Sequence, residues 1–334
     1  MRSTESGSNV AMQRKTILIV SDIHYAGAAE QLRHDHEAKV ISNPFLRFAV
    51  KIFRHYIWLR EPMQKNHLLD QFLNHPGPAD YVIANGDYSC DSAFLGVSDD
   101  ASFESARECL GKMRNRFAPN FRAIFGDHEL GKLSFFGARG GMRVGSFHRA
   151  EKELGLEPFW KMELGNYVLL GVVSSLIALP VFKHDILPEE QAEWTRLRED
   201  HLAKIRGAFA TLKPEQRVIL FCHDPTALPF LWEEDVVHSK IDQLEQTIIG
   251  HLHSSLILWK SGLLAGIPAV PFLGTSIKRF TTSLHRARHW KEFHVRLCPS
   301  LAGIELLKDG GYLSVELDLT AKTPARFERH RINR

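Results

Sequence analysis

Five short apolar runs in this chain each end abruptly in polar residues that carry Asp or His side chains. The runs lie at residues 16–20, 81–84, 121–125, 218–222 and 247–249. Runs of this length that are rich in β-branched residues are typical of strands buried on both faces of a sheet. Helical patterns are predicted between them, at about 63–74, 102–116 and 188–210. This alternation predicts an α/β fold whose functional side chains gather at the carboxyl ends of the strands.

The polar residues that follow the five runs form a mixed set of carboxylates and imidazoles. The set comprises Asp22, His24, Asp87, Asp127, His128, His223, His251 and His253. Such ligands suit Mn, Fe, Zn or Co, whereas sites for Mg or Ca are built mainly from oxygen. Two ligands separated by one residue lie on the same side of an extended segment and can reach one metal centre. A loop histidine or a helix-capping Asp explains any one of these segments equally well, but chance does not explain five at successive strand ends.

The composition narrows the class of protein. With 44% hydrophobic and 24% charged residues, the chain is neither disordered nor fibrous. A formal net charge of +3 is too small to indicate a nucleic-acid-binding protein by itself. The four cysteines are far apart and form no CxxC pair, which favours a reducing, cytoplasmic setting without disulfide bonds. No apolar run is long enough to predict a membrane-spanning helix.

One domain is expected over residues 15–320. Residues 1–14 are polar and lack the apolar core of a secretory signal, so they are predicted to be a disordered tail. Residues 321–334 are polar and basic and are predicted to be a second tail. The longest apolar stretch, 167–181, predicts a buried strand with its following loop, and the alternating segment 311–319 predicts a half-buried strand that closes a sheet.

In chain order, the polar segments form the series D-x-H, G-D, G-D-H-E, H and G-H-x-H over positions 22–253. This series resembles that of the calcineurin-like metallophosphoesterases. The resemblance implies a two-layer β-sandwich flanked by α-helices, with two divalent metal ions, Mn first among them, at one end of the sheets. Carried over by position, the first metal ion would be held by Asp22, His24 and His253, the second by Asp127, His223 and His251, and both by a bridging Asp87.

The resemblance also implies a reaction. Two metal ions about 3.5 to 4 Å apart polarise phosphoryl oxygens and supply hydroxide for in-line attack on phosphorus. His128 follows the predicted ligand Asp127 and is the expected proton donor to the leaving oxygen. Asp91, four residues beyond Asp87, is a candidate to orient His128. A loop Asp or a helix cap explains Asp91 nearly as well.

One residue departs from the family pattern. The third segment commonly reads G-N-H-[E/D], whereas this chain has Asp127 in place of Asn. An ionised Asp offers only acceptors, while Asn offers a carbonyl and an amide donor. The exchange predicts tighter metal binding together with repulsion of an anionic phosphate. It also keeps open a degenerate site that binds metal without catalysis.

Two basic regions are candidates for contact with substrate phosphates. The Gly-rich stretch 137–143 holds Arg139 and Arg143 and could cradle a diphosphate through its backbone N–H groups. A basic cluster at 278–296 begins with Lys278 and Arg279 and could bind phosphate groups or anionic lipid. A solvated charged face explains this cluster equally well.

Residues 43–61 predict an amphipathic helical insert between the first two metal-binding segments. Bulky apolar side chains fall at helical spacing on one face, and basic side chains occupy the rest. The apolar members are Phe45, Phe48, Ala49, Ile52, Phe53, Tyr56 and Ile57, and the basic members are Arg47, Lys51, Arg54 and His55. Packing on the core is the ordinary explanation, and contact of residues 44–60 with a membrane surface or with acyl chains is the alternative.

Three functions remain open. The first is hydrolysis of a lipid-linked nucleotide diphosphate at the inner face of the membrane, by resemblance to the metallophosphoesterases that cleave UDP-2,3-diacylglucosamine in lipid A synthesis. The second is a soluble phosphodiesterase or phosphatase for nucleotides, phosphoproteins or other small phosphoesters. The third is a non-catalytic metal-binding module. Nucleic acid is a weaker expectation because the basic residues do not accompany a groove-reading motif. The sequence predicts no oligomeric state.

Overall fold

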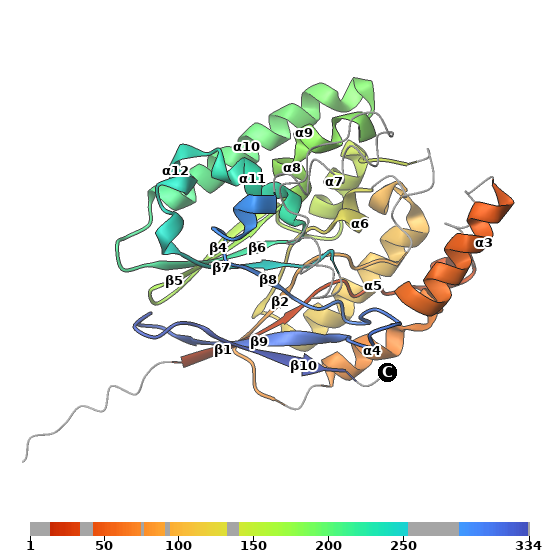
Figure 1. Ribbon diagram of the computed structural model, residues 1–334, viewed down its shortest axis with the longest axis horizontal. Coiled ribbons are helices and arrows are strands. Elements are labelled where there is room, and N and C mark those ends of the chain that lie inside the picture. The colour runs from red at the N-terminus through yellow and green to blue at the C-terminus, as the bar shows by residue number, and fades with distance from the viewer. Residues whose placement is uncertain are drawn as a thin grey trace, which may run out of the picture.

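Two five-stranded sheets pack against each other, with helices on their outer faces (Figure 1). The computed structural model describes residues 14–33, 43–74, 77–90, 94–131, 140–252 and 287–332. The first sheet has the strand order β10-β9-β1-β2-β3, and the second has the order β4-β5-β6-β7-β8. This arrangement confirms the α/β fold with two sheets flanked by helices.

The first sheet is mixed. Strand β1 (Arg14–Val20) runs parallel to β2 (Tyr81–Ala84), which runs parallel to β3 (Phe121–Ala123). On the other side, β1 pairs antiparallel with β9 (Gly311–Asp318), and β9 pairs antiparallel with β10 (Arg326–Arg331). The carboxyl ends of β1, β2 and β3 therefore share one edge of the sheet, and each is followed by a predicted metal-binding segment.

The second sheet also contains both parallel and antiparallel strand pairs. Strand β4 (Phe159–Leu164) pairs antiparallel with β5 (Tyr167–Val172). Strands β5, β6 (Arg217–Cys222), β7 (Leu244–Ile249) and β8 (Val295–Leu297) are parallel neighbours. The predicted ligands in this half of the chain follow β6 and β7.

Alternate residues of the inner strands enter two different layers of the core. Ile17 and Ile19 of β1 pack in the layer between the sheets, together with Ile219 and Phe221 of β6. Their neighbours, such as Leu18, face the layer beneath the helices. Because both faces of these strands are buried, their sequences are almost continuously apolar, which is why the apolar runs predicted them.

Helices cover the two outer faces. On the first sheet lie α4 (Asn66–Leu73) and α5 (Asp100–Phe117), and α4 contacts β9 through the rings of Phe72 and Tyr312. The second sheet is covered by α8 (Ser174–Ile177), α9 (Leu179–Phe182), α10 (Gln191–Ala210), α11 (Leu228–Trp232) and α12 (Asp235–His238) (Figure 1). Shorter helices near the strand ends are α1 (Ala28–Gln31), α6 (Asp127–Leu130) and α7 (Val144–Lys152).

The predicted amphipathic insert is helical. It forms α3 (Pro44–Phe53), which continues into one π-helical segment at Arg54–Trp58. The Asn43 side chain accepts hydrogen bonds from the N–H groups of Phe45 and Leu46, so it caps the helix. Pro44 occupies the first turn of the helix. Backbone N–H groups in the first turn have no acceptor within the helix, so proline costs no hydrogen bond there.

Two predictions outside the metal-binding segments are wrong. Residues 321–334 contain the edge strand β10 and are not a tail, because 326–331 pair with β9 and half-bury Phe327. Charged side chains are common on such edge strands, and this is why the segment resembled a solvated tail. The segment after β5 is helical and is not a loop, since α8 and α9 occupy it. Of the predicted N-terminal tail, residues 1–13 lie outside the described residues, and Arg14 begins β1.

Candidate metal centre

The predicted ligands converge where the parallel strands of both sheets end. Asp22 follows β1, Asp87 follows β2, Asp127 follows β3, and His223 and His251 follow β6 and β7. Hydrogen bonds join the two sheets at this point. The His251 N–H donates to Asp22 Oδ1 at 3.1 Å, and His223 Nδ1 lies 2.6 Å from the Asn85 carbonyl oxygen.

The side chains form three overlapping triads, in each of which the candidate ligand atoms lie within 4.8 Å of one another. The triads are His24, Asp87 and His128; Asp127, His223 and His251; and Asp22, Asp87 and His223. Asp87 and His223 each belong to two triads, so the candidate ligands form one continuous centre. The predicted bridging residue Asp87 lies in the middle of it.

Measured separations show how tightly the centre is packed. His223 Nε2 lies 3.1 Å from Asp87 Oδ2 and 3.9 Å from Asp127 Oδ1. His251 Nδ1 lies 2.9 Å from Asp127 Oδ2. The three carboxylates are each at most 3% exposed. Buried carboxylates need cationic partners, so this donor set fits divalent metal ions.

Four of the candidate ligands hold a left-handed backbone conformation. The φ angles are 49° at Asp22, 50° at His24, 60° at Asp87 and 59° at His251. Such angles are uncommon for residues other than glycine and concentrate at functional sites.

The glycine that precedes a ligand allows neighbouring segments to approach closely. A Cβ atom on Gly126 would lie 2.2 Å from Asp87 Oδ1, and one on Gly250 would lie 2.1 Å from Ser21 Oγ and 2.6 Å from Asp22 Oδ2. A larger residue at either position would push the carboxylates apart. Gly126 and Gly250 therefore belong to the packing of the centre.

Backbone carbonyls orient the imidazoles. His223 Nδ1 donates to the Asn85 carbonyl, which leaves Nε2 directed at the carboxylates. The Nδ1 atoms of His24 and His128 lie 3.4 Å and 3.0 Å from the same Ser89 carbonyl oxygen. The Ser89 carbonyl therefore helps to orient His128, whereas Asp91 lies outside the described residues and its predicted role stays a prediction. A backbone carbonyl leaves no signal in the sequence, so this partner could not have been predicted.

The surroundings shift the pKa values of the ionisable groups in the centre in different directions. Burial and the Asp87 charge raise the pKa of Asp22 to about 6. Burial also acts to raise the pKa of Asp87, but the surrounding histidines, His223 first, lower it well below its usual value. Burial and the neighbouring His128 lower the pKa of His24 to about 3, so His24 is a neutral imidazole available as a ligand.

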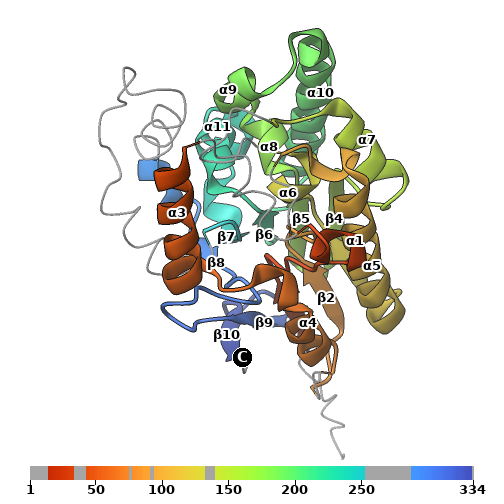
Figure 2. The ribbon, with the colours of Figure 1, turned by 90° about the vertical axis from the view of Figure 1, so that its right-hand side faces the viewer.

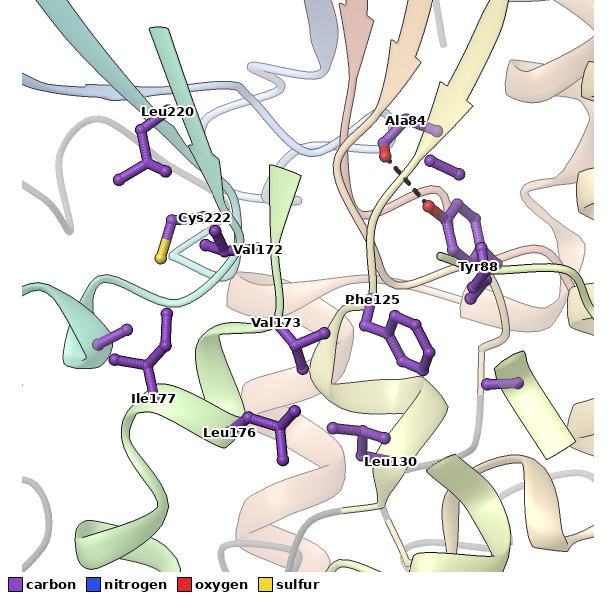
Figure 3. Packing of buried hydrophobic residues seen from close by; sticks show 14 of the residues in the cluster. Ala84, Tyr88, Phe125, Leu130, Val172, Val173, Leu176, Ile177, Leu220 and Cys222 are labelled. Atoms are coloured by element: carbon purple, nitrogen blue, oxygen red, sulfur yellow. Dashed lines mark hydrogen bonds between the residues drawn. The ribbon is translucent and has the colours of Figure 1, made fainter. Parts of the chain in front are cut away.

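A further buried carboxylate, Glu129, stabilises the two loops that carry Asp87 and Asp127. It is fully buried and accepts hydrogen bonds from the N–H groups of Asp87 (3.1 Å), Tyr88 (2.9 Å) and Gly126 (2.7 Å). The Tyr88 hydroxyl donates to the Ala84 carbonyl, as Figure 3 shows, and to that of Ile124. Glu129 was visible in the sequence as part of G-D-H-E, but its role required the structure.

The predicted roles of several site residues stay predictions. His253, Asp91, Arg139, Lys278 and Arg279 lie outside the described residues. Arg143 is described, and its guanidinium donates to the carbonyls of Gly140 and Met142. These bonds stabilise the adjacent turn, so they give Arg143 a structural role and do not test its predicted contact with substrate.

The chain is similar to one family model and to several solved structures. A family model described as calcineurin-like phosphoesterase matches residues 15–255. No curated protein matches the chain. Among solved structures, the chain is similar to a phosphopantetheinyl hydrolase from Mycobacterium tuberculosis, at 14% identity and a TM-score of 0.34, over 71% of this chain and 83% of that one.

Two further solved structures are similar over most of their length. A predicted phosphoesterase from Streptococcus pneumoniae is 12% identical, with a TM-score of 0.26, over 96% of this chain and 100% of that one. A metallophosphoesterase from Sphaerobacter thermophilus is 12% identical, with a TM-score of 0.33, over 96% and 89% of the two chains.

Proposed function

The chain belongs to the calcineurin-like phosphoesterase family and is a metal-dependent hydrolase, and from this premise we propose that it cleaves a phosphoester or phosphoanhydride bond at the centre described above. One observation carries the proposal: three buried carboxylates and four imidazoles meet in overlapping triads at the ends of two sheets. A purely structural role does not require so many ionisable groups in one buried place.

The donor set supports a pair of divalent metal ions, and Mn is the first candidate. Asp127, His223 and His251 would hold one ion, as their triad groups them, and Asp22 and Asp87 would contribute carboxylates to the other. Bound divalent ions supply Lewis-acid stabilisation of phosphoryl oxygens and lower the pKa of water. The chain's own residues fix the donors and exclude bulk water from the carboxylates.

His128 is suited to move a proton at the edge of the centre. Its side chain is 18% exposed, in contrast to the buried Asp87 and His223, so a substrate can reach it. The Ser89 carbonyl holds Nδ1, and Nε2 lies 3.9 Å from Asp87 Oδ2. We therefore assign His128 to protonation of the leaving oxygen, although it also shares a triad with His24 and Asp87.

The proposal is tested by metal analysis together with hydrolysis of bis(p-nitrophenyl) phosphate. We expect metal-dependent turnover that is lost with chelator and restored by Mn. Replacement His128→Ala should lower kcat by about a hundredfold on an alkyl phosphodiester, whose leaving alkoxide needs a proton, and much less on bis(p-nitrophenyl) phosphate, while metal content stays the same. A chain that binds metal but shows no turnover on phosphodiester or phosphomonoester substrates would instead be the non-catalytic module.

A lipid-linked nucleotide diphosphate, such as UDP-2,3-diacylglucosamine, is the finer substrate proposal. It is supported by the exposed aromatic helix α3, whose side chains suit acyl chains better than water. The alternative is a soluble nucleotide, phosphoprotein or other small phosphoester. Comparison of kcat/KM for the acylated UDP-sugar and for its deacylated form separates the two, because only a lipid-directed enzyme prefers the acylated form.

A further inference from the structure

Helix α3 and the π-helical segment after it expose a row of large apolar side chains. Phe45 is 86% exposed, Phe48 66% and Tyr56 65%, and Ile52, Phe53 and Ile57 are each at least 40% exposed. Val50 is the one residue of α3 that is buried. The structure therefore contradicts packing on the core as the explanation of this apolar face. Monomeric proteins rarely expose a contiguous apolar surface without using it.

A distant segment of the chain extends the same surface. The N–H groups of Glu305 and Leu306 donate to the carbonyls of Trp58 (2.8 Å) and Ile57 (3.2 Å). These bonds hold Leu306, which is 64% exposed, beside the π-helical segment. We define the α3 surface as Phe45, Phe48, Ile52, Phe53, Tyr56, Ile57 and Leu306. Since two segments about 250 residues apart build it, the surface belongs to the fold.

The charge of the residues around the α3 surface indicates which kind of partner it binds. Residues 43–60 contain Arg47, Lys51, Arg54 and Arg60 and no acidic residue. An amphipathic helix with aromatic residues on one face and basic residues around it lies in the headgroup region of anionic bilayers. Within the part of the chain that the structure describes, no helix is long and apolar enough to cross a membrane. We propose that the α3 surface docks this protein onto the surface of an anionic lipid bilayer.

The loop that extends the α3 surface also contacts the metal centre. The Leu301 N–H donates to the Ser21 carbonyl at 3.0 Å, and Ser300 Oγ donates to the Asp22 carbonyl at 3.1 Å. Four residues later, the same loop bonds to the π-helical segment. Helix α3 lies at the end of the molecule toward which β1 points (Figure 1), and Figure 2 views the molecule from that end. Docking therefore brings the metal centre close to the lipid surface, a consequence that bears on hydrolysis only if the proposed function holds.

Flotation of the full chain with lipid vesicles tests the docking proposal directly. We expect binding to vesicles that contain phosphatidylglycerol and much weaker binding to vesicles of phosphatidylcholine alone. The double variant Phe45→Glu and Phe48→Glu should reduce binding by at least about tenfold, because both side chains must then bring charge into the interface. The matched control is Leu32→Glu at the C-cap of α1. Leu32 is 81% exposed, and Figure 2 shows α1 away from α3. This control should bind vesicles as the unchanged chain does.

Three results would overturn the proposal. They are no flotation with phosphatidylglycerol vesicles, equal flotation of the double variant, and equal loss in the Leu32→Glu control. A dimer that the double variant converts to monomer, without vesicle binding, would show instead that the surface joins two copies of the chain. Circular dichroism and turnover of bis(p-nitrophenyl) phosphate in solution serve as folding controls. Failure of the proposed hydrolysis would abolish turnover and leave flotation unchanged, so the two proposals fail in distinguishable ways.

Discussion

At the scale of single residues, Asp127 decides how this centre differs from its family pattern. Its carboxylate is 3% exposed, with one oxygen 2.9 Å from His251 Nδ1 and the other 3.9 Å from His223 Nε2. Both oxygens thus face imidazoles of the same triad. A carboxylate at this position adds negative charge to the centre and offers no donor to a substrate phosphate.

The variant Asp127→Asn tests this residue. Loss of the negative charge should weaken metal retention, while the new amide donor should raise kcat/KM at saturating metal by about tenfold, the value of one hydrogen bond to a charged group. Metal analysis after dialysis and phosphodiester kinetics measure the two effects. If metal content and kcat/KM are both unchanged, Asp127 is not a ligand.

Glu129 acts on the centre without being one of its candidate ligands. Burial and the nearby Asp87 raise its pKa to about 7. At pH 8 the carboxylate is therefore ionised and accepts three backbone N–H bonds from the loops of Asp87 and Asp127. In Glu129→Gln an N–H2 group replaces one carboxylate oxygen, so at least one of these buried N–H donors loses its acceptor.

We expect Glu129→Gln to lower the free energy of unfolding by about 2 to 3 kcal/mol at pH 8. Metal retention should fall as well, because the loops that present Asp87 and Asp127 lose their common anchor. Urea unfolding measures the first effect and metal analysis the second. The control is Glu104→Gln, which removes a partly exposed carboxylate paired with Arg107 on α5 and should change neither quantity appreciably.

At the scale of elements, α10 is attached to the second sheet through a buried histidine. His201 is 3% exposed, and its Nε2 accepts a hydrogen bond from the Val173 N–H at 3.1 Å, just beyond β5. This bond requires a neutral imidazole. Burial, with a smaller contribution from Lys204, lowers the pKa of His201 from 6.5 to about 3. His201 therefore binds a proton near pH 6.5 in the unfolded chain, but it stays neutral at that pH in the folded chain.

The lowered pKa of His201 makes the stability of the fold depend on pH. The contribution of His201 to stability is intact above pH 6.5 and is lost as the pH falls below it, by about 2 kcal/mol at pH 5. In His201→Gln the amide oxygen can still accept from Val173, so this acid-dependent loss should disappear. Urea unfolding at pH 7 and pH 5 measures it, with the exposed His67→Gln as control. The same pH dependence in both variants would show that His201 is not the responsible group.

The strands show how far the sequence determines the elements. Strands β1, β2, β6 and β7 were predicted because they are buried on both faces, and their apolar runs have no other explanation at that length. Strand β10 was missed because its charged residues match those of a solvated tail, and only pairing with β9 makes it a strand. Element type is thus predictable where burial determines the sequence and unpredictable at an edge, where pairing partners decide.

At the scale of the whole molecule, the chain brings segments from residue 22 to residue 251 into one centre. The order of those segments predicted the candidate ligands, because metal chemistry requires particular side chains. The left-handed backbone at Asp22 and Asp87 and the Ser89 carbonyl that holds two histidines were not predictable. These features depend on how the two sheets pack against each other. The periodicity of the sequence does not predict that packing.

The same convergence couples global stability to metal ions and to pH. In the metal-free chain, burial raises the pKa of Asp22 to about 6. Burial alone would lower the pKa of His223, but the charges of Asp87 and Asp22 raise it well above its usual value. Both groups bind protons more tightly in the folded state than in the unfolded state. Their contribution to stability is therefore complete at low pH and is lost as the pH rises through these folded-state values.

Divalent ions must displace those protons, so metal binding should stabilise the fold more as the pH rises. With free Mn about a thousandfold above its Kd, the gain reaches about 4 kcal/mol, and it should be large at pH 8 and small at pH 5. Unfolding in the presence of Mn or of chelator, measured at both pH values, gives the gain directly. The variant Asp22→Asn, which removes one carboxylate from the triad of Asp22, Asp87 and His223, should reduce the gain at pH 8. A gain that is equal at the two pH values would mean that the ions bind elsewhere, since only ligands that exchange protons for metal give this dependence.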